Sequence, residues 1–109
     1  MKIENSKKQM KRGVLEYCIL SILNTGQKYS ADIIDRMKKE DLIVVEGTLY
    51  PLLTRLKNDG YLEYRWEESK QGPPRKYYQI TEPGSTFLNE LKDEWKQLVK
   101  SVNNINKSK

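Results

Sequence analysis

Hydrophobic residues recur every three or four positions in several stretches of the chain, a spacing typical of amphipathic helices. The first stretch predicts a helix over residues 7–24, with capping-box spacing between Ser6 and Gln9. The second predicts a shorter helix over residues 30–39, which we expect Ser30 to cap. The first third of the chain is therefore expected to form two helices joined by a short loop.

Two further helices follow the same spacing. One is predicted over residues 46–59, although Pro51 lacks the N–H group that a helix interior uses. The other is predicted to begin near Thr81 and to run to Ile105, about 36 Å at 1.5 Å per residue. Its hydrophobic residues recur in alternating steps of three and four, as in a coiled-coil seam: Leu88, Leu91, Trp95, Leu98, Val102 and Ile105. This seam predicts that the helix pairs with a second copy of the chain.

Between these two helices the hydrophobic pattern changes to a period of two. Leu62, Tyr64 and Trp66 share one side of a predicted strand, and Trp66 is expected to pack beneath the resulting hairpin. Residues 70–74 contain Gly and Pro and predict a turn, and residues 77–81 predict the return strand. Three short helices followed by a β-hairpin describe a winged helix-turn-helix, a mainly helical α+β fold.

The chain has 109 residues, of which 37% are hydrophobic, so we expect one small unit with a limited core. Residues 1–81 are expected to form a winged helix-turn-helix DNA-binding domain, and residues 82–109 a dimerisation helix with a polar tail. The sequence contains no His and one Cys. These counts exclude histidine-dependent catalysis, Cys₂His₂ zinc sites and intramolecular disulfides, so we expect no catalytic residue, metal or cofactor.

No hydrophobic run approaches the ~18–20 residues of a membrane span, and the N-terminus has no apolar segment of a secretory signal. We therefore expect a cytoplasmic protein without membrane contact. Cys18 lies on the hydrophobic stripe of the first helix and is expected to be an inert thiol, with a redox switch as the alternative.

Basic residues outnumber acidic residues by 20 to 15, and the excess is unevenly distributed. Residues 1–28 carry six basic and two acidic side chains, whereas residues 29–60 carry five and six. The excess thus flanks the third helix, where it suits phosphate contacts or simply solubility. The exposed side of that helix carries groups suited to bases and phosphates: Thr48, Tyr50, Thr54, Arg55, Lys57 and Asn58. The alternative is a winged helix that binds a protein partner instead of an operator.

Several motifs, in order along the chain, resemble the PadR family of transcriptional regulators. Gly13–Glu16 is similar to the family's first-helix motif, and Tyr29–Ile33 to the start of its second helix. Glu46–Leu53, with its internal proline, resembles the family's recognition helix, and Gly72–Tyr78 resembles its wing. The resemblance covers about residues 10–90 and points to the short type with one C-terminal helix.

The resemblance implies a homodimeric repressor that binds near-palindromic double-stranded DNA and leaves it on binding a small molecule. The residues expected to contact DNA are Lys8, Lys11, Tyr29, Thr48, Tyr50, Pro51, Thr54, Arg55, Lys57, Arg75 and Lys76. The residues expected at the dimer interface are Leu88, Leu91, Trp95, Leu98 and Val102. Arg75 is expected to contact phosphate, with stabilisation of the turn as its alternative role. Tyr50 is expected at the DNA face because leucines already fill the core side of its helix.

Trp95 has two interpretations. It can serve only as a packing anchor of the dimer, since it lies in the middle of the seam. In some short PadR regulators, however, a tryptophan at this place stacks flat aromatic ligands, which implies a small aromatic or phenolic ligand here. Tyr17 on the first helix would close such a site if it faced Trp95.

Overall fold

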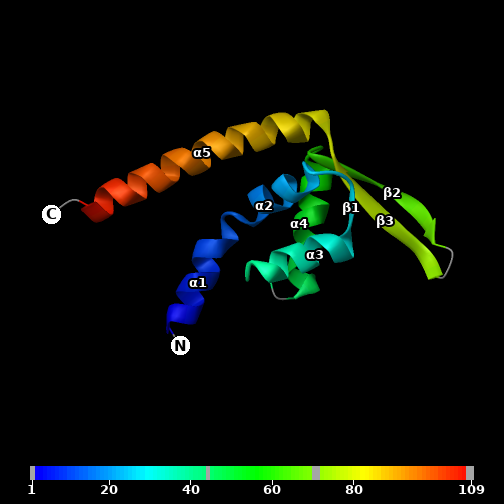
Figure 1. The fold of residues 1–109 in the computed structure, drawn as a ribbon, viewed down its shortest axis with the longest axis horizontal. Coiled ribbons are helices and arrows are strands. Elements are labelled where there is room, and N and C mark those ends of the chain that lie inside the picture. The colour runs from blue at the N-terminus through cyan, green and yellow to red at the C-terminus, as the bar shows by residue number, and fades with distance from the viewer. Residues whose placement is uncertain (1, 44, 70–71, 108–109) are drawn as a thin grey trace.

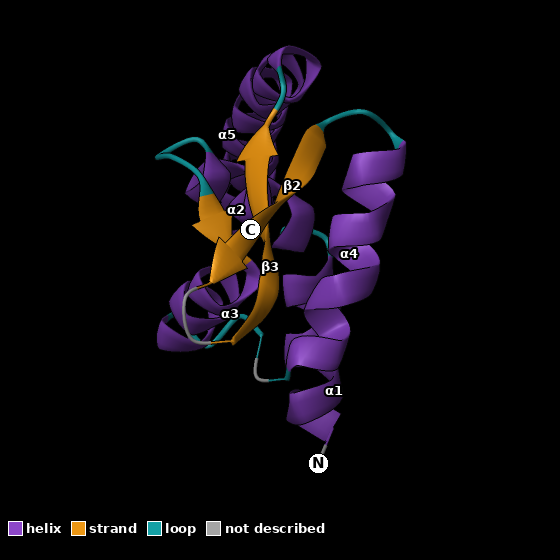
Figure 2. Cartoon of the chain, turned by 90° about the vertical axis from the view of Figure 1, so that its right-hand side faces the viewer, coloured by secondary structure: helices purple, strands orange, loops and turns teal. Residues whose placement is uncertain are grey.

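The structure is a computed structural model that describes residues 2–43, 45–69 and 72–107, and in these ranges it has five helices and three strands (Figure 1). In chain order they are α1 (Lys2–Arg12), α2 (Leu15–Leu23), β1 (Lys28–Tyr29), α3 (Ser30–Lys39), α4 (Glu46–Asn58), β2 (Leu62–Ser69), β3 (Gly72–Ile80) and α5 (Glu82–Lys107). The predicted winged helix-turn-helix with a long last helix is confirmed. Figure 2 shows α4 alongside the β2–β3 hairpin, with α1 near the N-terminal end of α4.

The single helix predicted over residues 7–24 is wrong, because α1 and α2 are separate helices. Between them lie Gly13 and Val14, and Val14 is the N-cap of α2 with φ −107° and ψ −1°. Glycine weakens a helix interior, and the chain changes direction here so that α2 can enter the core while α1 buries no residue. Ser6, the expected cap, therefore lies inside α1.

Helix α3 has the predicted bounds, but its cap lies one residue earlier than expected. Tyr29 has an extended backbone, and its N–H donates to the Asp32 carboxylate at 3.1 Å. Ser30 is therefore the first helical residue and not the cap, and Asp32 fixes the start of the helix. Tyr29 also ends β1, a strand that the hydrophobic pattern did not predict.

The three strands form an antiparallel sheet in the order β1-β3-β2. The return strand begins at Gly72, not at the predicted residue 77, so Pro73 and Pro74 belong to a strand. They lie opposite an irregularity in the β2–β3 pairing between Glu67 and Ser69, where a missing backbone N–H is tolerated. The other two residues of the predicted turn, Lys70 and Gln71, lie outside the described residues.

The hydrophobic core lies where α2, α3 and α4 meet the sheet and the first turns of α5. Fully buried side chains come from each of these elements: Ile19, Leu20, Ile33, Leu49, Leu56, Leu62 and Leu88. Leu88 is only 1% exposed, so its expected place at the dimer interface is wrong, because the chain's own core already covers it. The seam that remains on α5 starts at Leu91, which is partly buried against the core.

Helix α5 is anchored to the body at its first turn. The Thr81 hydroxyl accepts the Gly84 N–H at 3.0 Å and donates to the Gly60 carbonyl at 2.6 Å. Gly84 is packed so closely that a Cβ there would lie 1.9 Å from the Tyr61 carbonyl oxygen. Phe87 stacks on Tyr61 with 4.1 Å between the ring centroids. The rest of α5 extends away from the body (Figure 1).

Trp66 does not pack beneath the hairpin as expected, because 62% of its surface is exposed. It shares a face of β2 with Tyr64, yet the core ends below Tyr64, and the indole ring meets the edge of Tyr64 and the Lys76 ammonium instead of the core.

None of the described helices combines the length and hydrophobicity that crossing a bilayer requires.

Candidate nucleic-acid interface

Helix α4 turns its leucines inward and its polar residues outward, as the sequence predicts. Leu49, Leu53 and Leu56 are buried. Tyr50 is 45% exposed, so it lies on the surface side of the helix and not in the core. Pro51 is also exposed, and α4 continues through it to Asn58. An α-helix with one polar exposed face has the form that enters a DNA major groove.

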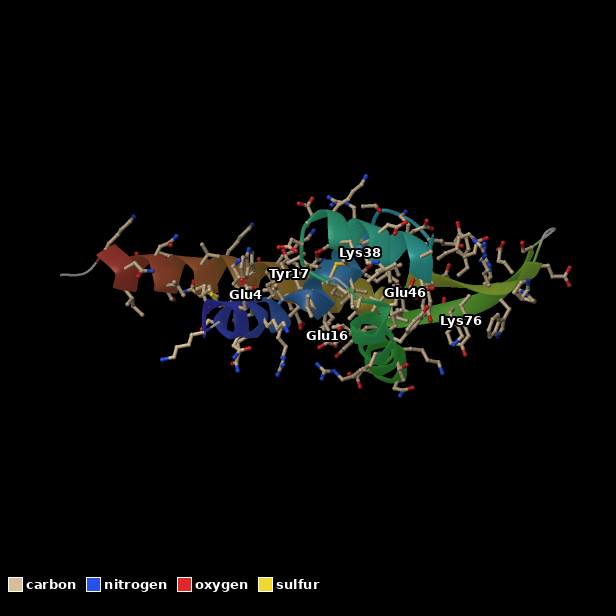
Figure 3. The ribbon with its side chains drawn as sticks, turned by 90° about the horizontal axis from the view of Figure 1, so that it is seen from below. Glu4, Glu16, Tyr17, Lys38, Glu46 and Lys76 are labelled. Atoms are coloured by element: carbon tan, nitrogen blue, oxygen red, sulfur yellow. The ribbon has the colours of Figure 1, made fainter. Side chains whose placement is uncertain are left out.

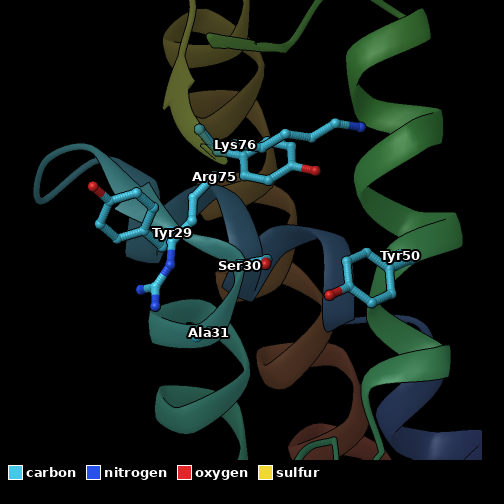
Figure 4. A pocket seen from close by; sticks show the side chains of 7 residues that line it. Tyr29, Ser30, Ala31, Tyr50, Arg75 and Lys76 are labelled. Atoms are coloured by element: carbon cyan, nitrogen blue, oxygen red, sulfur yellow. The ribbon is translucent and has the colours of Figure 1, made fainter. Parts of the chain in front are cut away.

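A hollow of about 420 Å³, here called the wing cleft, lies between the N-terminal end of α3, helix α4 and strand β3 (Figure 4). Its lining brings together four of the residues expected to contact DNA with three that were not expected: Tyr29, Tyr50, Arg75 and Lys76, then Ser30, Ala31 and Tyr78. Segments that are more than forty residues apart in the sequence thus form one concave surface with two cations.

Aromatic rings hold the polar groups of the wing cleft in place. Tyr29 meets Tyr77 edge to face, with 4.5 Å between the ring centroids. The Arg75 guanidinium lies 5.6 Å from the Tyr29 centroid, a cation–π contact. Burial, and then the neighbouring Tyr50 and Tyr64, raise the pKa of Tyr78, so its hydroxyl stays protonated at the floor of the cleft. Arg75 has no ion pair within the described chain and keeps its charge available for a phosphate.

A smaller hollow of about 140 Å³ adjoins the wing cleft, and Lys76 and Tyr78 line both. It contains Thr54 and Lys57 of α4, two further residues expected to contact DNA. The Lys76 ammonium lies 4.3 Å from the Tyr64 ring centroid. Lys57 lies 5.6 Å from the same ring. The C-terminal half of α4 and the wing therefore present two cations side by side.

Arg55 lies outside both hollows, because its guanidinium forms an ion pair with the Glu16 carboxylate on α2. The Arg55 side chain is 65% exposed and Glu16 only 24%, so the pair lies at the edge between α2 and α4. Glu16 is labelled on α2 in Figure 3. In this arrangement Arg55 joins two helices and points its charge at a carboxylate.

The remaining expected contacts, Lys8, Lys11 and Thr48, lie together at the N-terminal end of α4, around a hollow that also includes α1. The Lys11 ammonium donates to the Asp41 backbone oxygen at 2.7 Å and to its carboxylate at 3.4 Å. Asp41 has a positive φ of 58°, which turns the chain after α3 toward α1. Lys11 thus ties α1 to the body, and Lys8 is the freer cation of the two.

Tyr17 and Trp95 lie close together, as a shared aromatic site would require. Their ring centroids are 6.4 Å apart and the rings are tilted by 46°. Trp95 remains 41% exposed on α5. Next to Tyr17, Cys18 is half-buried, and burial raises the pKa of its thiol, which disfavours the reactive thiolate. Within residues 2–43, 45–69 and 72–107, no three His, Cys, Asp or Glu side chains are grouped to hold a metal ion.

Sequence reasoning missed Ser30, Ala31 and Tyr78 as lining of the wing cleft. The signal that could have located them is β1, since pairing Lys28 with Tyr78 brings the start of α3 beside the wing. It also missed Glu16, whose partner Arg55 is 39 residues away along the chain. No periodicity links two such positions.

Comparison with known proteins adds an independent finding. The model of the family described as "Transcriptional regulator PadR-like family" matches residues 19–90. A PadR-like transcription factor from Bacteroides fragilis is 58% identical over 93% of this chain and 98% of its own, with a TM-score of 0.78.

Two other solved structures are similar over most of their length. A PadR-like transcriptional regulator from Bacillus cereus is 37% identical, with a TM-score of 0.81 over 93% of this chain and 99% of that one. A PadR family transcriptional regulator from Eggerthella lenta is 27% identical, with a TM-score of 0.90 over 98% and 94%. The similarity therefore includes both the winged helix and most of α5.

Proposed function

Because the chain belongs to the PadR-like family of transcriptional regulators, which makes it a DNA-binding regulator, we propose that it represses transcription from a near-palindromic operator as a homodimer. In this proposal α4 enters the major groove and the β2–β3 wing contacts the flanking backbone. A repressor of this kind acts on chromosomal DNA, so we propose that the protein is located in the cytoplasm.

The observation that carries the proposal is the wing cleft. It joins Tyr50 of the recognition helix to Arg75 and Lys76 of the wing across one continuous surface. A groove-entering helix and a backbone-contacting wing must face the DNA from the same side, and the cleft meets that requirement. The N-terminal end of α3 opens into the same cleft, where its backbone N–H groups favour an anionic phosphate.

The homodimer is supported by the exposed seam of α5. Trp95, Leu98, Val102 and Ile105 are between 41% and 73% exposed, although they have the spacing of a buried helix–helix contact. A twofold pair through this seam would carry two α4 helices, which an operator accommodates about 34 Å apart, one turn of DNA. The near-palindromic operator follows from that twofold symmetry. In this division of labour, residues 1–81 bind DNA and residues 82–109 dimerise.

Release from the operator is assigned in this proposal to a small aromatic or phenolic ligand at Trp95 and Tyr17. The contact between the two rings and the exposure of Trp95 support a flat guest stacked on the free face of the Trp95 indole, across the dimer axis. Planar aromatic compounds should bind the parent in isothermal titration calorimetry, a readout that does not depend on an indole, and this binding should disappear in Trp95→Ala. If binding persists unchanged in that variant, Trp95 acts only as a packing anchor and the ligand part of the proposal fails.

The experiment for DNA binding is fluorescence anisotropy with labelled DNA from upstream of the protein's own gene and with a scrambled duplex of equal length. Specific binding should exceed scrambled binding by a factor of about 10³ or more at physiological salt. Thr48→Ala and Tyr50→Phe should lower the ratio of specific to scrambled affinity, because they remove base contacts. Arg75→Gln should instead lower the affinity for both duplexes by the same factor.

Equal affinity for the two duplexes, or binding that salt does not weaken, would contradict the operator proposal. It would favour the alternative function, a winged helix that docks on a protein partner. A stable heteromeric complex recovered without DNA, and lost in Tyr50→Ala, would then identify α4 as a protein-binding surface.

A further inference from the structure

A hollow of about 610 Å³, here called the α1 groove, lies between α1, the connector from α3 to α4, and the N-terminal end of α4. We propose that the α1 groove binds an organic anion with an aliphatic body, of the class of medium-chain carboxylates. This site is separate from Trp95 and Tyr17, since neither residue lines it. Its volume lies within the range of pockets that bind small molecules, about 300–1,000 Å³.

The floor of the groove is aliphatic. It is formed by side chains that share branched hydrocarbon character: Leu15, Leu42, Ile43, Val45 and Leu52. Val45 is 56% exposed, which leaves an apolar wall open to solvent beside the start of the recognition helix. No aromatic ring is among the lining residues that the structure describes, so the floor suits an alkyl chain better than a flat ring.

The rim of the groove is cationic after its internal pairs are accounted for. Lys7 faces Glu4 at 3.7 Å, and Lys11 faces Asp41 at 3.4 Å, so both acidic lining residues already have a basic partner. Two cations remain, Lys8 and Arg12, and neither forms an ion pair with any residue that the structure describes. A carboxylate over this pair, with its alkyl chain on the floor, matches both surfaces at once.

The packing of α1 supports an occupant at this place. Helix α1 buries no residue, and Lys11 is its hydrogen-bonded tie to the body at Asp41. An alkyl chain lying in the groove would add an apolar contact to a helix whose own apolar residues, Ile3 and Met10, are exposed. Figure 2 shows α1 near the N-terminal end of α4, the two elements whose residues line the groove together with the connector.

The groove connects to DNA binding through Thr48 and Lys8, which line it and which we expect to contact the operator. This regulatory step rests on the proposed function, because an anion over Lys8 would remove a phosphate contact and compete with DNA. Binding of the anion itself does not depend on the operator. The two parts can therefore be measured separately.

The test uses the full chain without DNA, with decanoate below its critical micelle concentration as the probe and 1-decanol as its neutral analogue. Isothermal titration gives the affinities, and amide chemical shifts locate the site. Decanoate should bind at least about tenfold more tightly than decanol, because Lys8 and Arg12 each favour the charged group. Shifts should concentrate on residues 4–15 and 42–52.

Variants separate this site from general charge attraction. Val45→Glu places a negative charge on the apolar lining of the groove and should lower the affinity for decanoate about tenfold or more. Arg12→Gln, which leaves the apolar lining unchanged, should lower this affinity several-fold. The matched control is the double variant Lys38→Gln, Lys39→Gln, which removes two cations from α3 outside the groove and should bind decanoate as the parent does.

Three results would overturn the inference: decanol binding as tightly as decanoate, equal losses of decanoate affinity in Arg12→Gln and in the α3 double variant, or loss of decanoate binding in Trp95→Ala.

The regulatory step is measured separately, by adding decanoate to the complex of the protein with operator DNA and following the release of the DNA. A protein that binds decanoate in the groove but binds no operator contradicts the proposed function alone. A protein that binds the operator but not decanoate contradicts this inference alone.

Discussion

Lys76 lies where the wing approaches the recognition helix, and two aromatic rings hold it there. Its ammonium is 4.3 Å from the Tyr64 ring centroid and 5.5 Å from that of Trp66. Trp66 is therefore exposed with its ring facing the Lys76 ammonium instead of the core. Cation–π contacts at exposed sites contribute about 0.5–1 kcal/mol, enough to restrict a long side chain without removing its charge from solvent.

We expect Lys76→Gln to weaken binding to operator and scrambled DNA alike and to lower the salt slope by about one unit, because one phosphate contact is lost. Trp66→Ala should weaken binding by a smaller factor, about two- to fivefold, with Trp66→Phe close to the parent. Anisotropy titrations at several salt concentrations measure both. Lys39→Gln serves as the control, and a slope unchanged by Lys76→Gln would remove Lys76 from the interface.

Glu16 restrains a second cation of the recognition helix. In the described structure it pairs with Arg55, so Arg55 must leave this carboxylate before it can reach DNA. We expect Glu16→Gln to tighten binding to all duplexes by up to about fivefold, because exposed ion pairs contribute about 0–1 kcal/mol. If Arg55 only joins α2 to α4, the same variant will lower the melting temperature and leave DNA affinity unchanged.

Among the elements, the start of α5 is where backbone packing is tightest. A Cβ on Gly84 would come within 1.9 Å of the Tyr61 carbonyl oxygen and 2.8 Å of the Ile80 side chain. A backbone oxygen cannot move aside as a flexible side chain can, so α5 or the end of the β2–β3 sheet would have to shift.

We expect Gly84→Ala to lower the free energy of unfolding by about 1–3 kcal/mol, the usual cost of overpacking. Chemical denaturation followed by circular dichroism measures this change. Gly47→Ala in α4 is the matched control, since a Cβ there meets nothing within 4 Å and alanine favours a helix. Equal stability of the two variants would show that the sheet yields to α5 at little cost.

The elements also show how far the sequence alone could predict this molecule. Helices α3 and α4 follow from three- and four-residue spacing because each buries one face, and α5 follows from the same spacing although most of its seam is exposed. The apolar stripe begins only at Val14, which marks where the chain enters the core, but the same spacing could not show that residues 2–12 form a separate helix. Strand β1 is two residues long and exists through its pairing with β3. The polar face of α4 was predictable, whereas the Arg55–Glu16 pair depends on how α2 and α4 pack.

As a whole, the molecule is more extended than a self-sufficient domain of its length. Its radius of gyration is 16.0 Å and its longest dimension is 61 Å. A compact domain of about this length has a radius near 13 Å. The difference comes from α5, whose 26 residues correspond to about 39 Å of helix, most of it beyond the core. The limited hydrophobic content of the chain is thus divided between the core of the body and the seam along α5, which is exposed in a single chain.

The whole-molecule prediction concerns that open surface. Leu98 and Val102 are 54% and 47% exposed, so replacing both with Glu should leave the body folded while placing charges in the paired seam. We expect analytical ultracentrifugation to show a monomer for Leu98→Glu, Val102→Glu and a dimer for the parent. Operator affinity should then fall by at least about 100-fold, because one half-site replaces two. Lys100→Glu, which changes charge on α5 outside the seam, is the control.

A dimer that survives the double variant would locate the interface elsewhere. If circular dichroism shows that the double variant is unfolded, the milder Val102→Ser takes its place, and we expect it to raise the dissociation constant of the dimer.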